Sequence, residues 1–314
     1  SRSMKRTEIK SSLCLLLAAV VWGVAFVAQS VGMDYVEPFT FNGIRSMIGG
    51  LVLIPCIFLM NRTHDKEEKE IDPKENAAKR KTLLIGGLCC GICLCVASNL
   101  QQIGISYTTV GKAGFITAMY ILFVPLGELL IFRKKLRWLL LPAVLLSVTG
   151  LYLLCMKAGA ALTLEGGDGT LLLCAVAFTA HILIIDRVSP RIDGVKLSCV
   201  QFAVAAVVSL IVALIAEKPS WDEIIRCWVP IADAGVMSGG VGYTLQIVGQ
   251  KDTDPTVASL ILCLESVFAV LGGWLILGDK MTAREYAGCG MMLIGILLAQ
   301  WPEKKPAASG SIRP

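Results

Sequence analysis

The sequence predicts an all-α polytopic membrane protein whose ten transmembrane helices form two inverted five-helix repeats. Three observations predict it: an apolar composition, ten long apolar runs, and a weak similarity between the two halves of the chain. Of 314 residues, 55% are hydrophobic and only 17% are charged, whereas soluble domains carry about 25% charged residues. A water-soluble fold could not cover that much apolar surface, so a lipid bilayer is the expected surrounding.

Ten apolar runs are long enough to cross the membrane, which takes roughly 20 residues in a helix. They are continuously apolar rather than alternating, which favours helices over the strands of a β-barrel. The runs of the first half are 12–32, 39–60, 83–101, 111–132 and 136–156. The runs of the second half are 169–187, 195–216, 227–247, 256–277 and 282–301.

The positive charges predict the orientation. If the N-terminus is inside, 22 of the 29 Lys and Arg residues fall on inside stretches and 6 on outside stretches. Because Lys and Arg accumulate on the cytoplasmic side, both termini are expected in the cytoplasm. The plasma membrane is the expected location. The expected tails are 1–11, which begins with an apparent expression scar, and 302–314, and 61–82 is expected to be a charged cytoplasmic loop.

A repeat relates the two halves, which are expected at 12–156 and 169–301. Shifting the later part of the chain by 145 residues places Gln101 on Gln246 and Tyr120 on Glu265. Five helices are an odd number, so the second half must start on the opposite side of the membrane. Inverted halves of this kind exchange conformations to give alternating access, with the substrate site near the midplane at their interface.

Three stretches carry a resemblance to a known family. AAVVWGVAFVAQ (18–29), NLQQIGISYTTVGKAGFITAMYILFVPL (99–126) and ASLILCLESVFAVLGGWLILGDKMT (258–282) resemble the EamA-type family of the drug/metabolite transporter superfamily. The resemblance implies ten helices around a central cavity and transport of small organic metabolites. Where many members have Pro after the ninth-helix Glu, this chain has Ser266, which weakens the kink expected there.

Glu265 is the first candidate for the site. A carboxylate in mid-membrane costs at least about 2.5–3.5 kcal/mol, so it normally faces a cavity or a partner. There it could attract a cationic substrate, or bind and release a proton during a transport cycle. The alternative is a structural Glu that is hydrogen-bonded to a neighbouring helix.

Six further side chains are predicted to bind substrate with Glu265. Aromatic rings suit a cation or a flat ring, and amides can hydrogen-bond a polar solute. Helix packing and polar contacts between helices are the alternative for each of them. The aromatic candidates are Trp22, Tyr120 and Tyr243, and the amide candidates are Asn99, Gln101 and Gln246.

Proton coupling is a hypothesis that rests on Glu265, His181 and Asp233. His181 is the only His in a predicted helix, and hydrogen bonding within the bundle is its alternative role. The cysteines of 89–95 are interpreted as small apolar residues, so no metal or cofactor is expected.

The predicted function is therefore a secondary active transporter of a small amino-acid-like or amine solute, with export the favoured direction. No nucleotide-binding loop and no catalytic constellation is visible, so gradient-driven transport is expected rather than an enzyme. No basic face is interleaved with aromatics, so no nucleic-acid partner is expected. Homodimerisation is a further hypothesis. The alternative function is a non-transporting membrane scaffold or lipid-binding protein.

Overall fold

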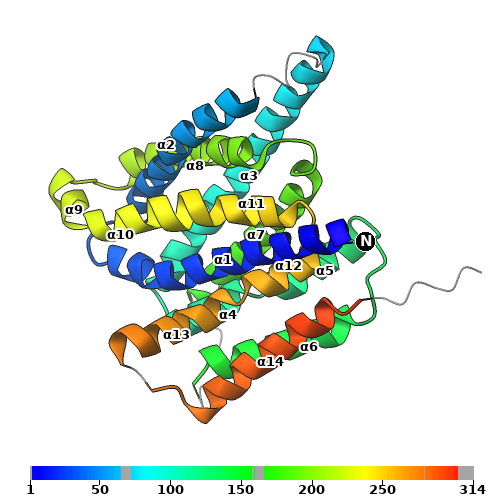
Figure 1. Ribbon diagram of the computed structural model, residues 1–314. Coiled ribbons are helices and arrows are strands. Elements are labelled where there is room, and N and C mark those ends of the chain that lie inside the picture. The colour runs from blue at the N-terminus through cyan, green and yellow to red at the C-terminus, as the bar shows by residue number, and fades with distance from the viewer. Residues whose placement is uncertain (1, 65–71, 158, 160–165, 279, 303–314) are drawn as a thin grey trace, which may run out of the picture.

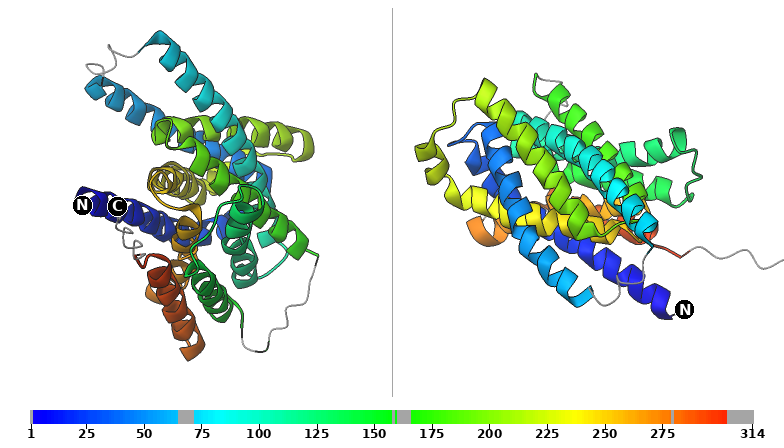
Figure 2. Two further views of the ribbon diagram at one scale, coloured as in Figure 1. Left: turned by 90° about the vertical axis from the view of Figure 1, so that its right-hand side faces the viewer. Right: turned by 90° about the horizontal axis from the view of Figure 1, so that it is seen from above.

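The described part of the chain is a single bundle of helices. The computed structural model describes residues 2–64, 72–157, 159, 166–278 and 280–302 (Figure 1). Within these ranges the elements are α-helices and one π-helical segment, and no strand occurs. The long helices lie side by side and mostly run back and forth between two ends of the bundle (Figures 1 and 2). The all-helical class predicted from the sequence is confirmed.

The chain passes through its helices in the following order. The first half contains α1 (Arg2–Gly32), α2 (Pro38–His64), α3 (Pro73–Ile105), α4 (Val110–Thr117), α5 (Tyr120–Leu130) and α6 (Leu140–Cys155). The second half contains α7 (Asp168–Val188), α8 (Gly194–Ala216), α9 (Trp221–Arg226), α10 (Trp228–Ala232), the π-helical η2 (Asp233–Tyr243), α11 (Thr244–Gln250), α12 (Pro255–Leu262), α13 (Glu265–Leu277) and α14 (Ala283–Ala299).

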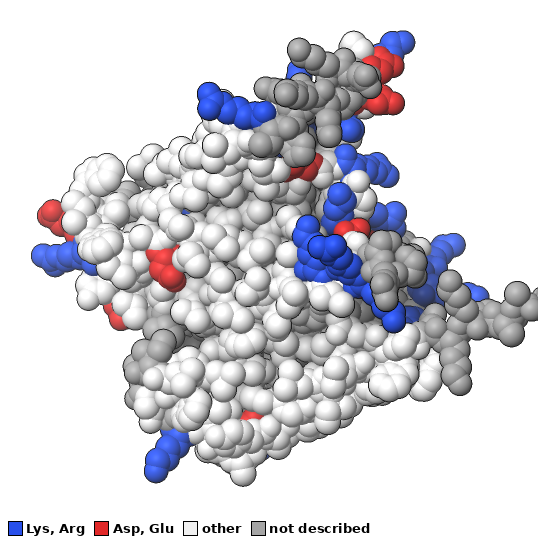
Figure 3. Space-filling view, viewed as in Figure 1, with Lys and Arg blue, Asp and Glu red and all other residues white. Residues whose placement is uncertain are grey.

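Seven segments of the described chain are long and apolar enough to cross a membrane. They are Lys5–Gly32, Pro38–Arg62, Pro73–Ile105, Gly111–Leu130, Asp168–Val188, Gly194–Ala216 and Pro255–Gly272. Figure 3 shows a broad uncharged surface, with Lys and Arg gathered mainly toward the right-hand end of the bundle and a few charges at the left. An uncharged band between charged ends matches the layers of a bilayer. The chain is a multi-pass membrane protein.

Exposed tryptophans lie at both ends of the bundle. Trp138 and Trp301 lie near the end where α1 begins, and Trp221, Trp228 and Trp274 lie toward the other end; all are exposed. Tryptophan concentrates at the two membrane–water interfaces because its ring is apolar and its N–H is polar. The two groups therefore mark the two interfaces.

The helices extend further into water than hydropathy predicted. α1 begins at Arg2 and covers most of the predicted tail 1–11. α2 continues to His64 and α3 begins at Pro73, so both run into the predicted loop 61–82, of which 65–71 lie outside the described residues. Hydropathy detects only the membrane-embedded part of a helix, whereas Glu, Lys, Arg and Ala continue a helix well in water.

Two helices predicted as continuous are interrupted, and a third changes its geometry. The run 111–132 is divided into α4 and α5, and 256–277 into α12 and α13. The run 227–247 consists of α10, the π-helical η2 and the start of α11. An apolar run shows that a segment is buried in lipid, but not whether its backbone stays regular.

Close backbone contacts join α6 to α14. A Cβ on Gly150 would lie 2.6 Å from the carbonyl oxygen of Gly288, and a Cβ on Gly288 would lie 2.5 Å from that of Gly150. Small residues allow helices to approach in membranes, where packing rather than the hydrophobic effect drives association. The pair therefore depends on glycine at both positions.

The N-terminus of α2 is capped by Glu217, a residue of the second half of the chain. The Glu217 carboxylate, at the end of α8, accepts hydrogen bonds from the amides of Phe39 and Thr40 at 2.9 Å each and from the Thr40 hydroxyl at 2.6 Å. These amides have no partner inside their own helix. A carboxylate there also interacts favourably with the helix dipole.

We expect Glu217→Ala to destabilise the protein by about 1–2 kcal/mol, because α2 loses its cap. The melting temperature of the purified protein measures the loss. Glu223→Ala is the matched control, because Glu223 is exposed on the nearby α9. Equal melting temperatures for the two variants would show that the cap contributes nothing.

Lys134, in the turn after α5, joins two helices through carboxylates. Its Nζ lies 3.1 Å from an oxygen of the buried Glu128 and 2.7 Å from an oxygen of Asp254 at the start of α12. Partial burial lowers the pKa of Lys134, whereas hydrogen bonds and charge interactions with Asp254 and Glu128 raise it, and its net pKa lies above the ordinary lysine value. This stabilisation is therefore present below the ordinary lysine pKa and is lost only as pH rises through the higher folded-state value.

We expect Lys134→Met to lower stability by about 1–3 kcal/mol, because the buried Glu128 carboxylate loses its cation. Adding Glu128→Gln should recover part of the loss, since an uncharged amide needs no cation. Thermal melting of the two single variants and the double variant gives the coupling between them. Lys135→Met, at the exposed neighbour, serves as the control, and a strictly additive double variant would contradict the ion pair.

Candidate functional site

A small cavity lies in the interior where α1, α3, α7, η2, α11 and the two interrupted helices meet. Polar and aromatic groups share its wall with aliphatic ones. It is lined by Trp22, Phe26, Gln29, Gln101, Thr117, Tyr120, Phe178, Ile182, Ser238, Tyr243, Gln246, Leu262 and Glu265.

The two helix interruptions beside the cavity have the same geometry. Between α4 and α5 the Met119 amide donates to the Ile116 carbonyl at 3.1 Å, and between α12 and α13 the Leu264 amide donates to the Ile261 carbonyl at 3.1 Å. Each bond reaches back three residues rather than four, so each interruption is a 3₁₀ turn. Such turns within a helix often mark hinges. The second interruption forms although Ser266 replaces the expected proline.

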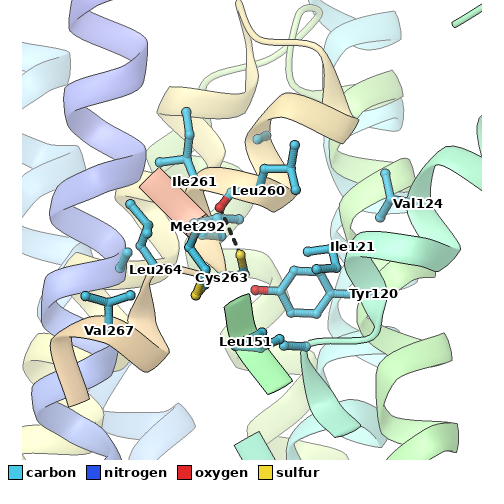
Figure 4. Packing of buried hydrophobic residues seen from close by; sticks show 14 of the residues in the cluster. Tyr120, Ile121, Val124, Leu151, Leu260, Ile261, Cys263, Leu264, Val267 and Met292 are labelled. Atoms are coloured by element: carbon cyan, nitrogen blue, oxygen red, sulfur yellow. Dashed lines mark hydrogen bonds between the residues drawn. The ribbon is translucent and has the colours of Figure 1, made fainter. Parts of the chain in front are cut away.

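Tyr120 and Glu265 are the first residues of α5 and α13, so each reaches the cavity from an interruption. Tyr120 is 5% exposed and Glu265 is half-buried. Figure 4 shows the Tyr120 ring pointing from α5 toward Cys263 in the opposite interruption, and the phenol is close enough to Glu265 to interact electrostatically. The N-terminus of α13 favours a carboxylate at its first residue.

An aromatic pair forms another part of the wall. The rings of Trp22 on α1 and Tyr243 at the end of η2 have centroids 4.7 Å apart and are tilted by 51°. The Trp22 indole N–H donates to the Ser238 carbonyl at 3.1 Å. Gly242 makes this contact possible, because a Cβ there would collide with the indole nitrogen. The π-helical η2 thus places both the Ser238 carbonyl and the Tyr243 ring against Trp22 in the cavity wall.

Gln246 on α11 contributes a polar atom that needs a partner. Its side-chain nitrogen donates to the Gln250 oxygen at 2.8 Å, and Gln250 in turn donates to the Ile182 carbonyl at 3.1 Å. The Gln246 side-chain oxygen is buried and accepts no hydrogen bond from any described residue. A buried acceptor left unpaired costs about 1–3 kcal/mol, so a donor on a bound molecule would be stabilised there.

A comparison with known families decides the class of the molecule. The model of the EamA-like transporter family matches residues 9–156 and residues 166–301, which together cover nearly the whole chain. The chain belongs to this family. It is thereby a member of the drug/metabolite transporter superfamily, as the sequence motifs indicated.

Relatives of this EamA family member occur in archaea and bacteria. An uncharacterized transporter of Archaeoglobus fulgidus is 27% identical over 93% of this chain and 86% of its own length. The uncharacterized transporter YoaV of Bacillus subtilis is 20% identical over 92% of this chain and 96% of its own length. A solved crystal structure matches with a TM-score of 0.74 at 16% identity, covering 92% of this chain and 96% of that one, and shows the fold alone.

The EamA fold brings together all but one of the residues predicted to bind substrate. The cavity wall contains Trp22, Tyr120, Tyr243, Gln101, Gln246 and Glu265. Asn99 is outside it. Its amide nitrogen donates to the Cys95 carbonyl at 2.8 Å and to the Ser209 hydroxyl at 3.0 Å, and its oxygen accepts from Asn42 at 3.0 Å. Asn99 thus joins three helices of this EamA family member.

The other proton-coupling candidates lie away from the cavity wall. His181 is fully buried; one ring nitrogen lies 2.9 Å from the Gln201 side-chain oxygen, and its ring meets Tyr243 edge-on at 6.0 Å. Asp233 is the half-buried first residue of η2, with Arg45 as an opposite charge nearby. Of the three candidates, only Glu265 is itself a residue of the cavity wall.

Several cavity residues of this family member were missed from the sequence. Phe26 and Gln29 follow Trp22 by four and seven residues on α1, and Ile182 follows Phe178 by four on α7. These spacings put residues on one face of a helix. Once Trp22 was a candidate, its helical neighbours could have been predicted as well.

The cavity is small. Its space for the centre of a water-sized sphere is about 30 Å³, enough for about two or three waters. Sites for small organic molecules usually measure about 300–1,000 Å³. A solute could enter this EamA family member only after the surrounding helices move apart.

Proposed function

We propose that this EamA family member is a secondary active transporter of a small amine or amino-acid-like solute that binds in this cavity. The observation that carries the proposal is the Glu265 carboxylate, which lies in a wall that holds three candidate aromatic rings and no Lys, Arg or His among its described residues. A carboxylate in such a place requires a cation or a proton. An ammonium group beside Trp22 and Tyr243 would meet both the charge and the ring faces.

Alternating access between two inverted five-helix repeats is the proposed mechanism. The two helix interruptions, at residues 118–119 and 263–264, are 145 residues apart, which is the shift that relates the halves in the sequence. The family model also matches two separate stretches, one in each half. Both observations support ten membrane crossings, in which α4 with α5, α10 to α11, and α12 with α13 each form one.

Ion pairs at the two ends of the bundle are suited to act as gates. Lys134 joins Glu128 and Asp254 near the start of α12. At the other end of the bundle, Lys112 lies 2.9 Å from Asp168, and both side chains are nearly buried. In the proposed cycle the two ion pairs close the two ends, and opening one pair at a time exposes the cavity to the two sides alternately.

Direction, orientation and coupling complete the proposal. The Lys and Arg distribution supports cytoplasmic termini, the plasma membrane is the proposed location, export follows the expectation for the family, and proton coupling follows from Glu265. We also propose a homodimer. A bound proton and a bound ammonium compete for one carboxylate, so a proton that enters from one side displaces the solute to that same side, and the solute and the proton cross the membrane in opposite directions.

A binding screen followed by transport in proteoliposomes tests the proposal. Ligands raise the melting temperature of a protein that binds them, so amines, amino acids, nucleosides and quaternary ammonium compounds are screened on the purified protein. A saturable hit should then accumulate in vesicles when a pH gradient is imposed. Saturable binding without any transport would favour the scaffold or lipid-binding alternative instead.

A further inference from the structure

A second hollow, separate from the central cavity, opens at the end of the bundle where α1 begins. It lies between the end of α2, the start of α3, the turn from α7 to α8 and the end of α11, and has a volume of about 700 Å³. That is within the range of pockets that hold small molecules. We refer to it as the basic hollow.

Positive charge dominates the basic hollow. Its charged lining consists of Lys79, Arg80, Arg191, Lys196, Lys251 and Asp193. The single carboxylate is already engaged, because Asp193 accepts from the amides of Val195 and Lys196 at 2.8 and 3.1 Å at the start of α8. No ion pair joins the five cations to a carboxylate of the described chain. Among the described lining residues five cations face one carboxylate, so an added anion would be stabilised in the hollow.

The basic hollow lies at the boundary between membrane and water. The apolar lining residues Ile57 and Met60 are at the end of the span Pro38–Arg62, and Leu83 lies one turn further along α3 than the cations Lys79 and Arg80. The apolar groups lie on the membrane side of the hollow and the cations on the water side. This order matches a phospholipid, whose chains are in the membrane and whose phosphate is at its surface. Figure 3 shows Lys and Arg gathered toward this end of the bundle.

We propose that the basic hollow binds a phosphate group, supplied by the headgroup of an anionic phospholipid. Arg80 and Arg191 offer planar guanidinium forks that match two phosphate oxygens, and the lysines add mobile point charges. The cations come from α3, from the α7–α8 turn, from α8 and from the end of α11. A bound phosphate would thus hold parts of both halves of the chain together at this surface.

Binding of defined lipids to the full-length protein in a neutral detergent tests the proposal. Titration with short-chain phosphatidylglycerol, phosphatidylcholine and inorganic phosphate, followed by melting temperature, compares the sources. We expect saturable stabilisation by phosphatidylglycerol, at least about tenfold weaker with phosphatidylcholine. If inorganic phosphate saturates the same response at equal affinity, the phosphate site stands but its source is a free phosphate.

Variants connect the binding to the hollow. Arg80→Gln with Arg191→Gln should weaken phosphatidylglycerol binding at least about tenfold, whereas Arg80→Lys with Arg191→Lys should retain most of it. Arg6→Gln with Lys135→Gln removes two exposed cations at the same end of the bundle and should change the affinity less than about twofold. The lipid-free melting temperature reports whether each variant is folded. Equal losses for the hollow and control variants, or equal affinity for both lipids, would overturn the proposal.

Discussion

Glu265→Gln is expected to lower the affinity for a cationic solute by at least about tenfold, and to abolish its accumulation against a gradient. Glutamine has the same shape but no charge, so an ammonium group in the cavity loses its counterion. A single charge interaction in a site shielded from water is worth at least about 1.4 kcal/mol, which is a tenfold change in affinity. Binding to the purified protein and uptake into proteoliposomes measure the two effects separately.

The controls for Glu265→Gln separate the charge from the fold. Glu223→Gln removes an exposed carboxylate on α9 and should leave both measurements unchanged. Tyr120→Phe removes the hydroxyl that lies near Glu265 and should weaken binding by less than the loss of the charge. Wild-type affinity in Glu265→Gln would refute the carboxylate as the cation site.

Proton coupling through Glu265 can be tested separately from solute binding with the same Glu265→Gln variant. If Glu265 carries the proton, Glu265→Gln should still exchange a neutral or weakly bound solute across the membrane, but an imposed pH gradient should no longer drive its accumulation. A coupled carboxylate that is fixed in the neutral form cannot release a proton. A pH-driven response that survives in the variant would move the coupling to another group.

The 145-residue shift in the sequence predicted which residues meet at the cavity. The 145-residue shift pairs Tyr120 with Glu265 and Gln101 with Gln246, and all four line the cavity. Inverted halves put equivalent positions near their shared axis, so the alignment of the proposed halves predicted a proximity that neither stretch reveals alone. Asn99 has no such support, and it lies in a separate hydrogen-bond network.

The backbone geometry of the cavity could not be predicted in this way. No proline or glycine marks residues 118–119 or 263–264, and the proline of the first interrupted helix, Pro125, lies inside α5. Apolar runs are equally compatible with α, 3₁₀ and π turns, because hydropathy depends on side chains and the choice depends on tertiary packing. The π-helical η2 is rich in glycine, which lowers helix propensity, but the run 227–247 was predicted as a continuous helix.

The ion pairs at the two ends of the bundle could not be predicted from the sequence either. Glu128 is 2% exposed and contacts Lys134 and the Thr256 hydroxyl, the latter at 2.6 Å. Thr256 is 128 residues away in the chain. A long-range partner of this kind depends on which helices become neighbours, and local charge patterns do not contain that information.

Gly288→Ala is expected to destabilise the protein, although alanine favours a helix. A Cβ at Gly288 would lie 2.5 Å from the Gly150 carbonyl oxygen and 2.9 Å from the Leu154 amide nitrogen. Both obstacles are backbone atoms of α6, so no side chain can rotate away and the two helices must separate. Overpacking of this kind costs about 1–3 kcal/mol.

Gly290→Ala, on the same helix, is the matched control. A Cβ there meets nothing within 4 Å, so the substitution should be neutral or should stabilise by up to about 1 kcal/mol through helix propensity. The two variants differ only by position, and their melting temperatures should move in opposite directions or by clearly different amounts. Gly150→Ala should behave like Gly288→Ala, because the contact is mutual. Equal melting temperatures for Gly288→Ala and Gly290→Ala would mean that α6 and α14 do not meet at their glycines.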